Sequence, residues 1–484
     1  MRRDLGDFQT PPGLVDGVLD RLDALGIGHA RVFEPTCGRG HFLAGLLARP
    51  EPPVEVVGYE IQPAHLDEAR AIPAPSTAVR LEEADFFAVD LAASLRWESR
   101  GPLLVVGNPP WATSAGIARL GGVNGPARRP VAGLSGLDAR TGRANYDLAE
   151  AVWMGLLSAL DEPGTAIALL CKTSTARNVL RWAARTGRPV ASASIHRIDA
   201  RHWFGATVDA CLFVVRLGPA MAEPRAVVYP SLDSDTPEAT IGVVDGGLVA
   251  DLDALKAASA AALGRSPIAW RQGVKHDAAA VMELAWRDGA WRNGPGEAVD
   301  VEETHVYPLL KGGDLARPVG AAPGRRVIVT QHRLGEDTAG LEGRAPRLWS
   351  YLRRHAEAFA ARRSKVYEGR HPFAIFGVGD YTFARHKVAV SGLHRAPTFR
   401  ALGPVGGRPV LLDDTCYFLP IATAGQAARV AGLLNGPAAR SLIAALTFRD
   451  AKRPITKSIL QRVDYDRLAR RRPGRPLVGP CRVE

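Results

Sequence analysis

The sequence is poor in cysteine and contains no long apolar run. Its five cysteines lie far apart and form no Cys-x-x-Cys pair, which argues against both a zinc site and a disulfide framework. No apolar run approaches the roughly 20 residues of a membrane span, and no apolar signal region follows the charged N-terminus. We therefore expect a cytoplasmic protein with no metal site and no membrane partner, whose cysteines are small buried residues.

An excess of charge is also missing from the first part of the chain. Residues 1–217 hold 23 Lys and Arg against 23 Asp and Glu, whereas the remaining residues hold 38 against 27 and carry the whole net charge of +11. A polyanionic partner would accordingly be held by the second part. A basic surface that only aids solubility is the alternative. With 484 residues and 46% apolar content, the chain is expected to form two or three domains.

A glycine turn follows the first apolar strand pattern. The segment 30–43, ARVFEPTCGRGHFL, predicts a short strand, a tight turn and then a helix. Glycines at such a turn let a ligand approach the backbone, and a helix N-terminus offers free N–H groups. Just upstream, Thr10 is expected to cap a helix whose apolar positions run from Leu14 to Leu22.

Two further strand patterns end in acidic side chains. Residues 54–61, VEVVGYEI, have an apolar strand pattern that reaches an acidic residue at Glu60, about 20 positions after the glycine turn, which is the ribose-binding arrangement of nucleoside-binding α/β folds. Residues 79–87 place Asp85 and Phe86 at another strand end, where a carboxylate could accept from an exocyclic amine and a ring could cover a purine. Either residue alone could serve as a cap or in the core. Consecutive strand ends with such groups indicate a ligand crevice.

The next strand pattern, residues 103–107, runs directly into Asn108-Pro109-Pro110-Trp111. The two prolines fix φ and remove two backbone donors, so the turn is stiff and its carbonyl groups can accept hydrogen bonds from a ligand. Asn108 adds a side-chain carbonyl, and Trp111 adds a flat face for a planar ring. A rigid turn with a core tryptophan is the alternative.

In this order, the motifs TPP, FEPTCGRG, YE, ADFF and NPPW resemble those of S-adenosylmethionine-dependent DNA amino-methyltransferases, in the group with the cofactor half first and the target-recognition region last. These enzymes methylate the exocyclic amino group of adenine or, less often, of cytosine. The resemblance implies a catalytic set of Asn108, Pro109, Pro110, Trp111 and Phe204. It implies S-adenosylmethionine as cofactor, held by Thr10, Pro11, Glu34, Pro35, Cys37, Gly38, Gly40, Glu60, Ile61, Asp85, Phe86 and Asn108.

The role of Phe204 follows from the same resemblance. In relatives, an aromatic residue at this point stacks on a base that is flipped out of the duplex. Phe204 is the best match, Trp203 remains open, and an ordinary core position is the alternative for either. Together with Trp111, Phe204 is expected to sandwich the target base.

The implied fold is α/β. Residues 1–217 should form a Rossmann-like class I methyltransferase domain with a mixed, mostly parallel seven-stranded sheet, in which residues 112–144 are a mobile loop that closes over DNA or is a solvated insertion. Residues 218–265 should be a connector. Residues 266–484 should be a mixed α+β target-recognition domain with a C-terminal helical segment, in which residues 325–334, 373–383 and 387–393 have strand patterns.

The second part is expected to bind double-stranded DNA through basic side chains. The candidates for contact with DNA are Lys365, Arg370, Lys387, Arg395, Lys452 and Arg453, and each could instead be an ordinary surface charge. No acidic pair followed by Glu-x-Lys supports a fused nuclease, so any cognate restriction endonuclease would be a separate protein. A monomer is favoured.

The expected activity is N6 methylation of adenine. Adenine is favoured because relatives with Asn at the first position of the Asn-Pro-Pro motif mostly act on it, whereas cytosine enzymes more often carry Ser. Cytosine N4 methylation, methylation of RNA or of a protein glutamine, and a non-catalytic DNA-binding role remain the alternatives. The intact Glu60, Asp85 and Asn108 argue against the last of these.

Overall fold

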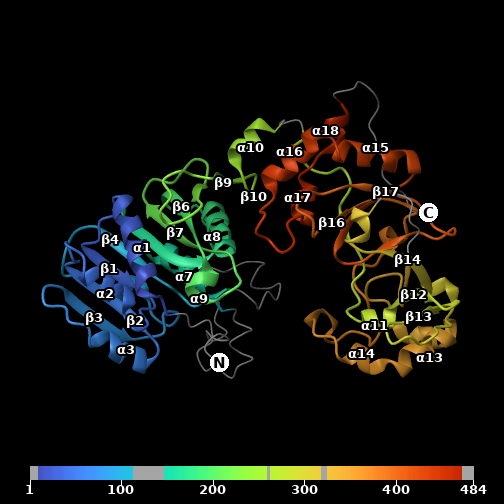
Figure 1. Cartoon of the computed structure of the whole chain (residues 1–484), viewed down its shortest axis with the longest axis horizontal. Coiled ribbons are helices and arrows are strands. Elements are labelled where there is room, and N and C mark those ends of the chain that lie inside the picture. Colours follow the sequence, from blue (N-terminus) through green and yellow to red (C-terminus); the bar gives the residue numbers. More distant parts are fainter. Residues whose placement is uncertain (1–8, 113–146, 259–261, 318–323, 471–484) are drawn as a thin grey trace. The chain divides into compact units, whose positions relative to one another are not determined.

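The structure is a computed structural model that describes residues 9–112, 147–258, 262–317 and 324–470. Except for Ala112, the loop expected at 112–144 lies outside these residues. The chain divides into two compact units, Met1–Asp253 and Ala254–Glu484. Each unit has its own sheets and helices (Figure 1). In the described part of the chain, no helix is both long and apolar enough to cross a membrane.

The first unit is built on one ten-stranded sheet with the order β10-β9-β8-β6-β7-β5-β4-β1-β2-β3. Its strands are β1 (Arg31–Glu34), β2 (Glu55–Glu60), β3 (Ala78–Glu83), β4 (Leu103–Gly107), β5 (Ala166–Lys172), β6 (Val190–Ile198), β7 (Ala210–Leu217), β8 (Arg225–Tyr229), β9 (Ala239–Val244) and β10 (Gly247–Val249). Strands β1 to β5 are mutually parallel, and β7 lies antiparallel between β5 and β6. Every residue of β1 and β4 is buried, and so is every residue of β5 except Lys172, as the apolar sequences predict.

The expected seven strands are present, but the sheet does not end there. Residues 225–249, expected to be a connector, form β8, β9 and β10 and extend the sheet beyond β6. Ile241 and Val249 are buried. Along the chain, the boundary between the two compact units lies between Asp253 and Ala254. The prolines around residue 220 mark an irregular link within the unit, so the position expected for the end of the first domain was wrong.

The sheet reverses its direction of growth between β1 and β4. The chain proceeds from β1 outward to β2 and β3, and then returns to β4 on the other side of β1 before continuing to β5. Because parallel crossovers are right-handed, the reversal sends the helices of the two halves to opposite faces and opens a crevice at the carboxyl ends of β1 and β4. The helices of this unit are α1 (Pro12–Ala24), α2 (His41–Leu47), α3 (Pro63–Arg70), α4 (Leu91–Ser94), α7 (Leu148–Ala159), α8 (Thr173–Thr186) and α9 (Ala200–Phe204), and α10 (Leu252–Ala257) spans the boundary.

The second unit is mixed α+β, with two sheets of orders β11-β19-β16-β17 and β13-β12-β15-β14-β18. Its strands are β11 (Arg271–Gln272), β12 (Glu283–Arg287), β13 (Ala290–Arg292), β14 (Val306–Leu310), β15 (Arg325–Ile328), β16 (His386–Ser391), β17 (Arg400–Leu402), β18 (Leu411–Leu412) and β19 (Cys416–Ile421). Its helices are α11 (Ala279–Met282), α12 (Leu341–Arg344), α13 (Pro346–Arg354), α14 (Ala356–Ala360), α15 (Ala424–Leu434), α16 (Pro437–Leu446), α17 (Lys457–Gln461) and α18 (Tyr465–Ala469).

One expected strand of this unit was wrong. Residues 373–383 make only an isolated bridge between Lys275 and Phe376 and then a short 3-10 helix at Asp380–Phe383. Phe373 and Ile375 are buried in the hydrophobic core, and Gly377 adopts a positive φ of 69° where a Cβ would lie 2.3 Å from the Gly273 carbonyl oxygen. The apolar pattern therefore reflects burial of an irregular segment, which periodicity alone does not distinguish from a strand.

A buried histidine in the first unit makes its stability sensitive to acid. His196 on β6 is fully buried, its ring stacks on Tyr229 at 4.7 Å between centroids, and its Nε2 lies 3.0 Å from the Ser194 hydroxyl. Burial lowers the pKa of His196 to about 4, and the nearby Arg21 charge acts in the same direction. The folded state therefore holds the imidazole neutral where the unfolded chain would protonate it.

We expect the unfolding free energy to fall as the pH drops from about 6.5 towards 4, because only the unfolded state gains the proton in this range. His196 should account for about 2 kcal/mol of the loss between about pH 7.5 and about pH 5. Urea unfolding of wild type and His196→Phe at both pH values measures it. An equal loss in the variant would show that another group is responsible.

Candidate active site

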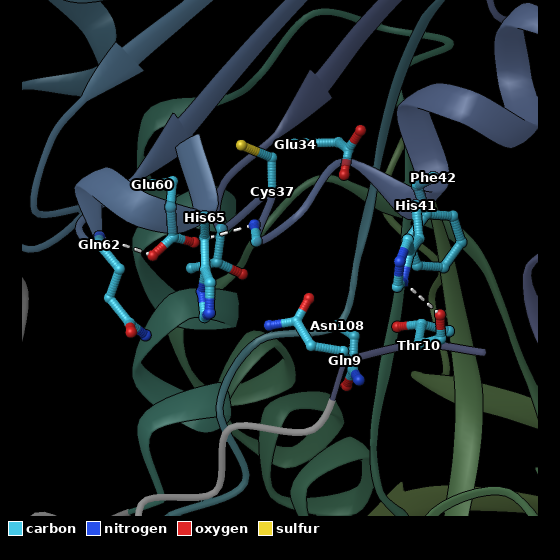
Figure 2. A pocket seen from close by; sticks show the side chains of 12 residues that line it. Gln9, Thr10, Glu34, Cys37, His41, Phe42, Glu60, Gln62, His65 and Asn108 are labelled. Atoms are coloured by element: carbon cyan, nitrogen blue, oxygen red, sulfur yellow. Dashed lines mark hydrogen bonds between the residues drawn. The ribbon is translucent and has the colours of Figure 1, made fainter. Parts of the chain in front are cut away.

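A pocket lies in the crevice of the first unit, at the carboxyl ends of the strands. Six of its lining residues were expected to bind cofactor: Thr10, Glu34, Cys37, Gly38, Glu60 and Asn108. They come from the segment before α1 and from the ends of β1, β2 and β4. Figure 2 shows Glu60, Gln62 and His65 on one side, His41, Phe42 and Thr10 on the other, and Asn108 between the two groups.

The glycine turn is shaped by close approaches that exclude side chains. Gly38 and Gly40 have positive φ values of 55° and 77°. A Cβ on Gly38 would lie 2.8 Å from Gln9 Oε1, and one on Gly40 would lie 3.0 Å from the Cβ of Ala69 in α3. Gly40 does not line the pocket, but it lets α2 begin immediately after the turn.

Glu60 is held in place by the turn that it faces. Its Oε2 accepts from the backbone N–H of Gly38 at 2.9 Å, and its Oε1 accepts from the N–H of Gln62 at 2.8 Å. The residue is only 7% exposed. Each carboxylate oxygen has a second lone pair and the residue lines the pocket, so the group can still accept from two hydroxyl groups of a ligand.

Glu34 is the second carboxyl group of the pocket, and its surroundings are very different. It is 1% exposed, and burial raises the pKa of Glu34 to about 8, although a hydrogen bond from the Leu43 backbone opposes the rise. Among the described residues, none gives a hydrogen bond to Glu34 Oε1 or to the Thr36 hydroxyl. A buried acceptor of this kind is suited to a cationic or hydrogen-bonding ligand.

Two histidines line the pocket without belonging to any motif. His41 Nδ1 lies 2.7 Å from the Thr10 carbonyl oxygen, so Nδ1 carries the proton and Nε2 is the nitrogen left for other partners. His65 on α3 is 8% exposed. Gln9, Thr36, Phe42 and Gln62 were missed as well. No spacing rule marks these residues, although His41 directly follows the glycine turn.

The Asn-Pro-Pro-Trp turn is anchored through its tryptophan. Asn108 is half-buried and lines the pocket, and Pro109 is buried. Trp111 is 5% exposed, and its indole N–H donates to the Leu170 carbonyl oxygen of β5 at 3.2 Å. The turn thus leads from the pocket to an aromatic side chain fixed against the next strand.

The two aromatic residues expected to hold a base touch each other directly. The ring centroids of Trp111 and Phe204 are 5.0 Å apart, with an angle of 73° between the planes. A base sandwiched between two faces needs about 7 Å, twice an ordinary contact distance, so the two rings leave no room for a base between them in this structure. Trp203 lies against α1, where a Cβ on Gly13 would be 3.5 Å from its ring.

Several of the expected cofactor residues lie outside the pocket lining. Asp85 accepts from the Phe87 backbone N–H at 3.0 Å, and Phe86 is 7% exposed and faces α7, close to Gly155. Pro35 lies beside Gly107, and Ile61 is half-buried. Thr10 does not cap α1, because the N-cap is Pro11, which lacks a side-chain hydrogen bond.

The six basic candidates in the second unit divide by exposure. Lys387 is 1% exposed, and burial lowers the pKa of its amine to about 7. Its Nζ donates to the Ala384 carbonyl oxygen at 2.6 Å, so direct contact with DNA is wrong for this residue. Arg453 donates to the Asp414 carbonyl oxygen at 3.0 Å and pairs with its carboxylate. The exposed candidates are Lys365, Arg370, Arg395 and Lys452.

Comparison with known proteins decides the family. The chain is 35% identical over 467 residues to the Type II methyltransferase M.NspV of Nostoc sp., which covers 96% of this chain and 97% of that protein. The chain belongs to the Type II methyltransferases. The family assigns S-adenosylmethionine as its cofactor, and this methyltransferase is of the DNA-modifying, restriction-modification type. No family model matches the sequence.

A solved structure shares the fold of this Type II methyltransferase. The structure of the Type IIL restriction-modification enzyme MmeI in complex with DNA matches with a TM-score of 0.55 at 11% identity, covering 93% of this chain. The chain spans 65% of the length of that protein. A modification subunit of a putative type I restriction enzyme from Vibrio vulnificus matches 46% of the chain with a TM-score of 0.32.

The pocket fits S-adenosylmethionine on its own chemistry. The carboxylate of Glu60 is fixed by two backbone N–H groups and keeps acceptor capacity for two ribose hydroxyl groups. The buried Glu34 can compensate a positive charge, since a nearby cation favours the ionised form of a carboxyl group that is otherwise neutral at neutral pH. The Glu34 and Glu60 carboxyl groups thus match the cationic and the ribose parts of the cofactor.

We expect Glu60→Gln to weaken cofactor binding about 10-fold to 100-fold, because a hydrogen bond to a charged group contributes about 1.5 to 3 kcal/mol. Isothermal titration of S-adenosylmethionine measures the effect. Glu83→Gln is the matched control, since Glu83 pairs in register with Glu60 but is exposed and outside the pocket lining. Equal affinities for Glu60→Gln and wild type would exclude the ribose role.

Proposed function

We propose that the protein methylates N6 of adenine in duplex DNA, as the modification component of a restriction-modification or phage-defence system. The observation that carries the proposal is the position of Asn108, which lines the cofactor pocket and begins a stiff turn ending at the aromatic pair. An amino group placed there would face the cofactor on one side and a ring-binding surface on the other.

The chemistry needs hydrogen-bond acceptors and correct placement more than a strong base. Asn108 Oδ1 and the Pro109 carbonyl oxygen accept hydrogen bonds from the amino group, which draws its lone pair out of conjugation with the ring. The cofactor supplies an electrophilic methyl group on a sulfonium. When bound, the cofactor would give up this methyl group to the amino nitrogen held by Asn108 and Pro109, and the nitrogen would then lose one proton to water. Most of the rate enhancement comes from positioning.

The target base has to leave the helix to reach Asn108. Because the Trp111 and Phe204 rings are in edge-to-face contact, a base can enter only if one ring moves. Trp111 is the ring held by β5, so Phe204, at the end of the five-residue helix α9, is the one proposed to shift. In this arrangement the base stacks on a fixed Trp111, and Phe204 closes over its other face.

The preference for adenine rests on the asparagine at the first position of the motif, and the cytosine alternative has a direct test. Unmethylated bacterial genomic DNA is incubated with the protein and labelled cofactor, then digested to nucleosides. Label in N6-methyl-2'-deoxyadenosine supports the proposal, and label in N4-methyl-2'-deoxycytidine replaces it. Label transferred only to RNA or protein would refute a DNA substrate.

The second unit is proposed to recognise the target sequence in duplex DNA. Its excess of basic residues supports a polyanionic partner, and the MmeI structure that shares the fold was solved in complex with DNA. Arg395 and Lys452 are exposed on neighbouring loops, since the Ile455 backbone N–H donates to the Gly392 carbonyl oxygen. A separate restriction endonuclease and a monomeric state remain part of this proposal.

We expect Asn108→Ala to bind S-adenosylmethionine with nearly wild-type affinity and to transfer methyl groups about 100-fold more slowly or worse, because an acceptor for the amino group is lost. Single-turnover transfer to genomic DNA and cofactor titration measure the two effects. Asn178→Ala is the control, as Asn178 bonds to Glu150 outside the pocket lining. Wild-type turnover in Asn108→Ala would contradict the assignment.

We expect the double variant Arg395→Glu, Lys452→Glu to bind DNA more weakly and to flatten the dependence of log affinity on log salt by about one for each lost phosphate contact. Fluorescence anisotropy at several salt concentrations measures this. The control is Arg429→Glu, an exposed residue on α15. A slope that is unchanged in the double variant would remove these residues from the DNA interface.

A further inference from the structure

Strand β5 holds both the side chain and the backbone of Trp111. Its indole N–H donates to the Leu170 carbonyl oxygen at 3.2 Å, and its own carbonyl oxygen accepts from Lys172 Nζ at 2.8 Å. Leu170 and Lys172 are alternate residues at the carboxyl end of β5, which pairs with β4 through Gly107 and Leu169. The strand next to β4 thus fixes both the ring and the backbone of the tryptophan.

Lys172 is itself fixed by a second contact. Its Nζ lies 2.7 Å from Asp147 Oδ2, and the two side chains are only 23% and 13% exposed. Asp147 is the N-cap of α7, where its Oδ1 accepts from the Ala149 N–H at 3.0 Å. Each oxygen of this carboxylate therefore has a defined partner, and the ammonium group is held between the helix and the turn.

The turn between β4 and Trp111 can transmit this restraint to Asn108. Pro109 and Pro110 have fixed φ angles, so few backbone rotations remain between the pocket and Trp111. On the β4 side, Gly107 is paired in the sheet. On the other side, the contact with Trp111 comes from Lys172. Losing that contact releases one end of a segment whose other end carries the acceptor groups.

We propose that Lys172 is a positioning residue for methyl transfer, which together with Asp147 holds the Trp111 carbonyl and so keeps Asn108 and the base-stacking ring in register with the cofactor. This inference rests on the proposed function. Lys172 is outside the pocket lining, so its effect should be on the rate of transfer. A lysine with a purely structural role would affect folding stability, or cofactor affinity and rate together.

The experiment compares two variants. Lys172→Met keeps the length of the side chain but loses its charge and its hydrogen-bond donors, whereas Lys172→Arg keeps the charge and the donors. Single-turnover methyl transfer is measured at saturating S-adenosylmethionine and genomic DNA, and cofactor affinity is measured by titration. We expect Lys172→Met to transfer about 100-fold more slowly, as a misplacement of about 1 Å can cost, with cofactor affinity within about threefold of wild type. Lys172→Arg should recover most of the rate.

The matched control is Arg49→Met, which removes a 2.6 Å ion pair with Asp20 at the surface of the same unit and should leave the rate unchanged. If Lys172→Met does not fold, Asp147→Asn gives the answer, since it weakens the hold on Lys172 and should slow transfer about 10-fold.

A Lys172→Met protein with the wild-type rate, or with affinity reduced as much as rate, would overturn the inference. If Lys172→Met does not fold, a wild-type rate in Asp147→Asn would overturn it. A wild-type protein that transfers no methyl group to DNA would instead overturn the proposed function.

Discussion

The reversal of strand order between β1 and β4 is the constraint on which the site depends. Parallel strands buried on both faces must be connected by crossovers of one hand, and a sheet that grows in both directions from β1 leaves a crevice at its carboxyl edge. The glycine turn, Glu60 and Asn108 are brought together because each follows a strand at that edge. The three features lie close together in space although they are far apart in the sequence.

Much of this edge was predictable from sequence, because a ligand-binding strand end leaves a local signature. Glu60 lies at the end of an apolar strand, at a known interval from a glycine turn. Asn108 directly follows a strand and is followed by two prolines. His65 and Gln9 left no such signature. Each reaches the pocket from a helix or an entering segment whose position depends on tertiary packing, and packing is not encoded in local spacing.

The errors in the sequence analysis have a common physical origin, since they concern long-range arrangement. The residues that became β8, β9 and β10 have ordinary strand patterns, and only their pairing with β6 shows that they extend the sheet. Lys387 is an inward-facing residue of β16, and a charged residue in an otherwise apolar strand looks exposed until its neighbours are placed. Trp111 and Phe204 were correctly associated, but their contact geometry depends on side-chain packing.

The alternation of side chains in β5 has an evolutionary consequence. Lys172 reaches Trp111 with its side chain and Leu170 does so with its backbone carbonyl oxygen, and both contacts depend on the register in which β4 pairs with β5. Inserting or deleting one residue there would place Cys171 or Thr173 where Lys172 now donates to the Trp111 carbonyl oxygen, while a backbone carbonyl would still face the indole N–H. Divergence at this strand should thus proceed by substitution, and its length should be inherited as a unit with the Asn-Pro-Pro-Trp turn.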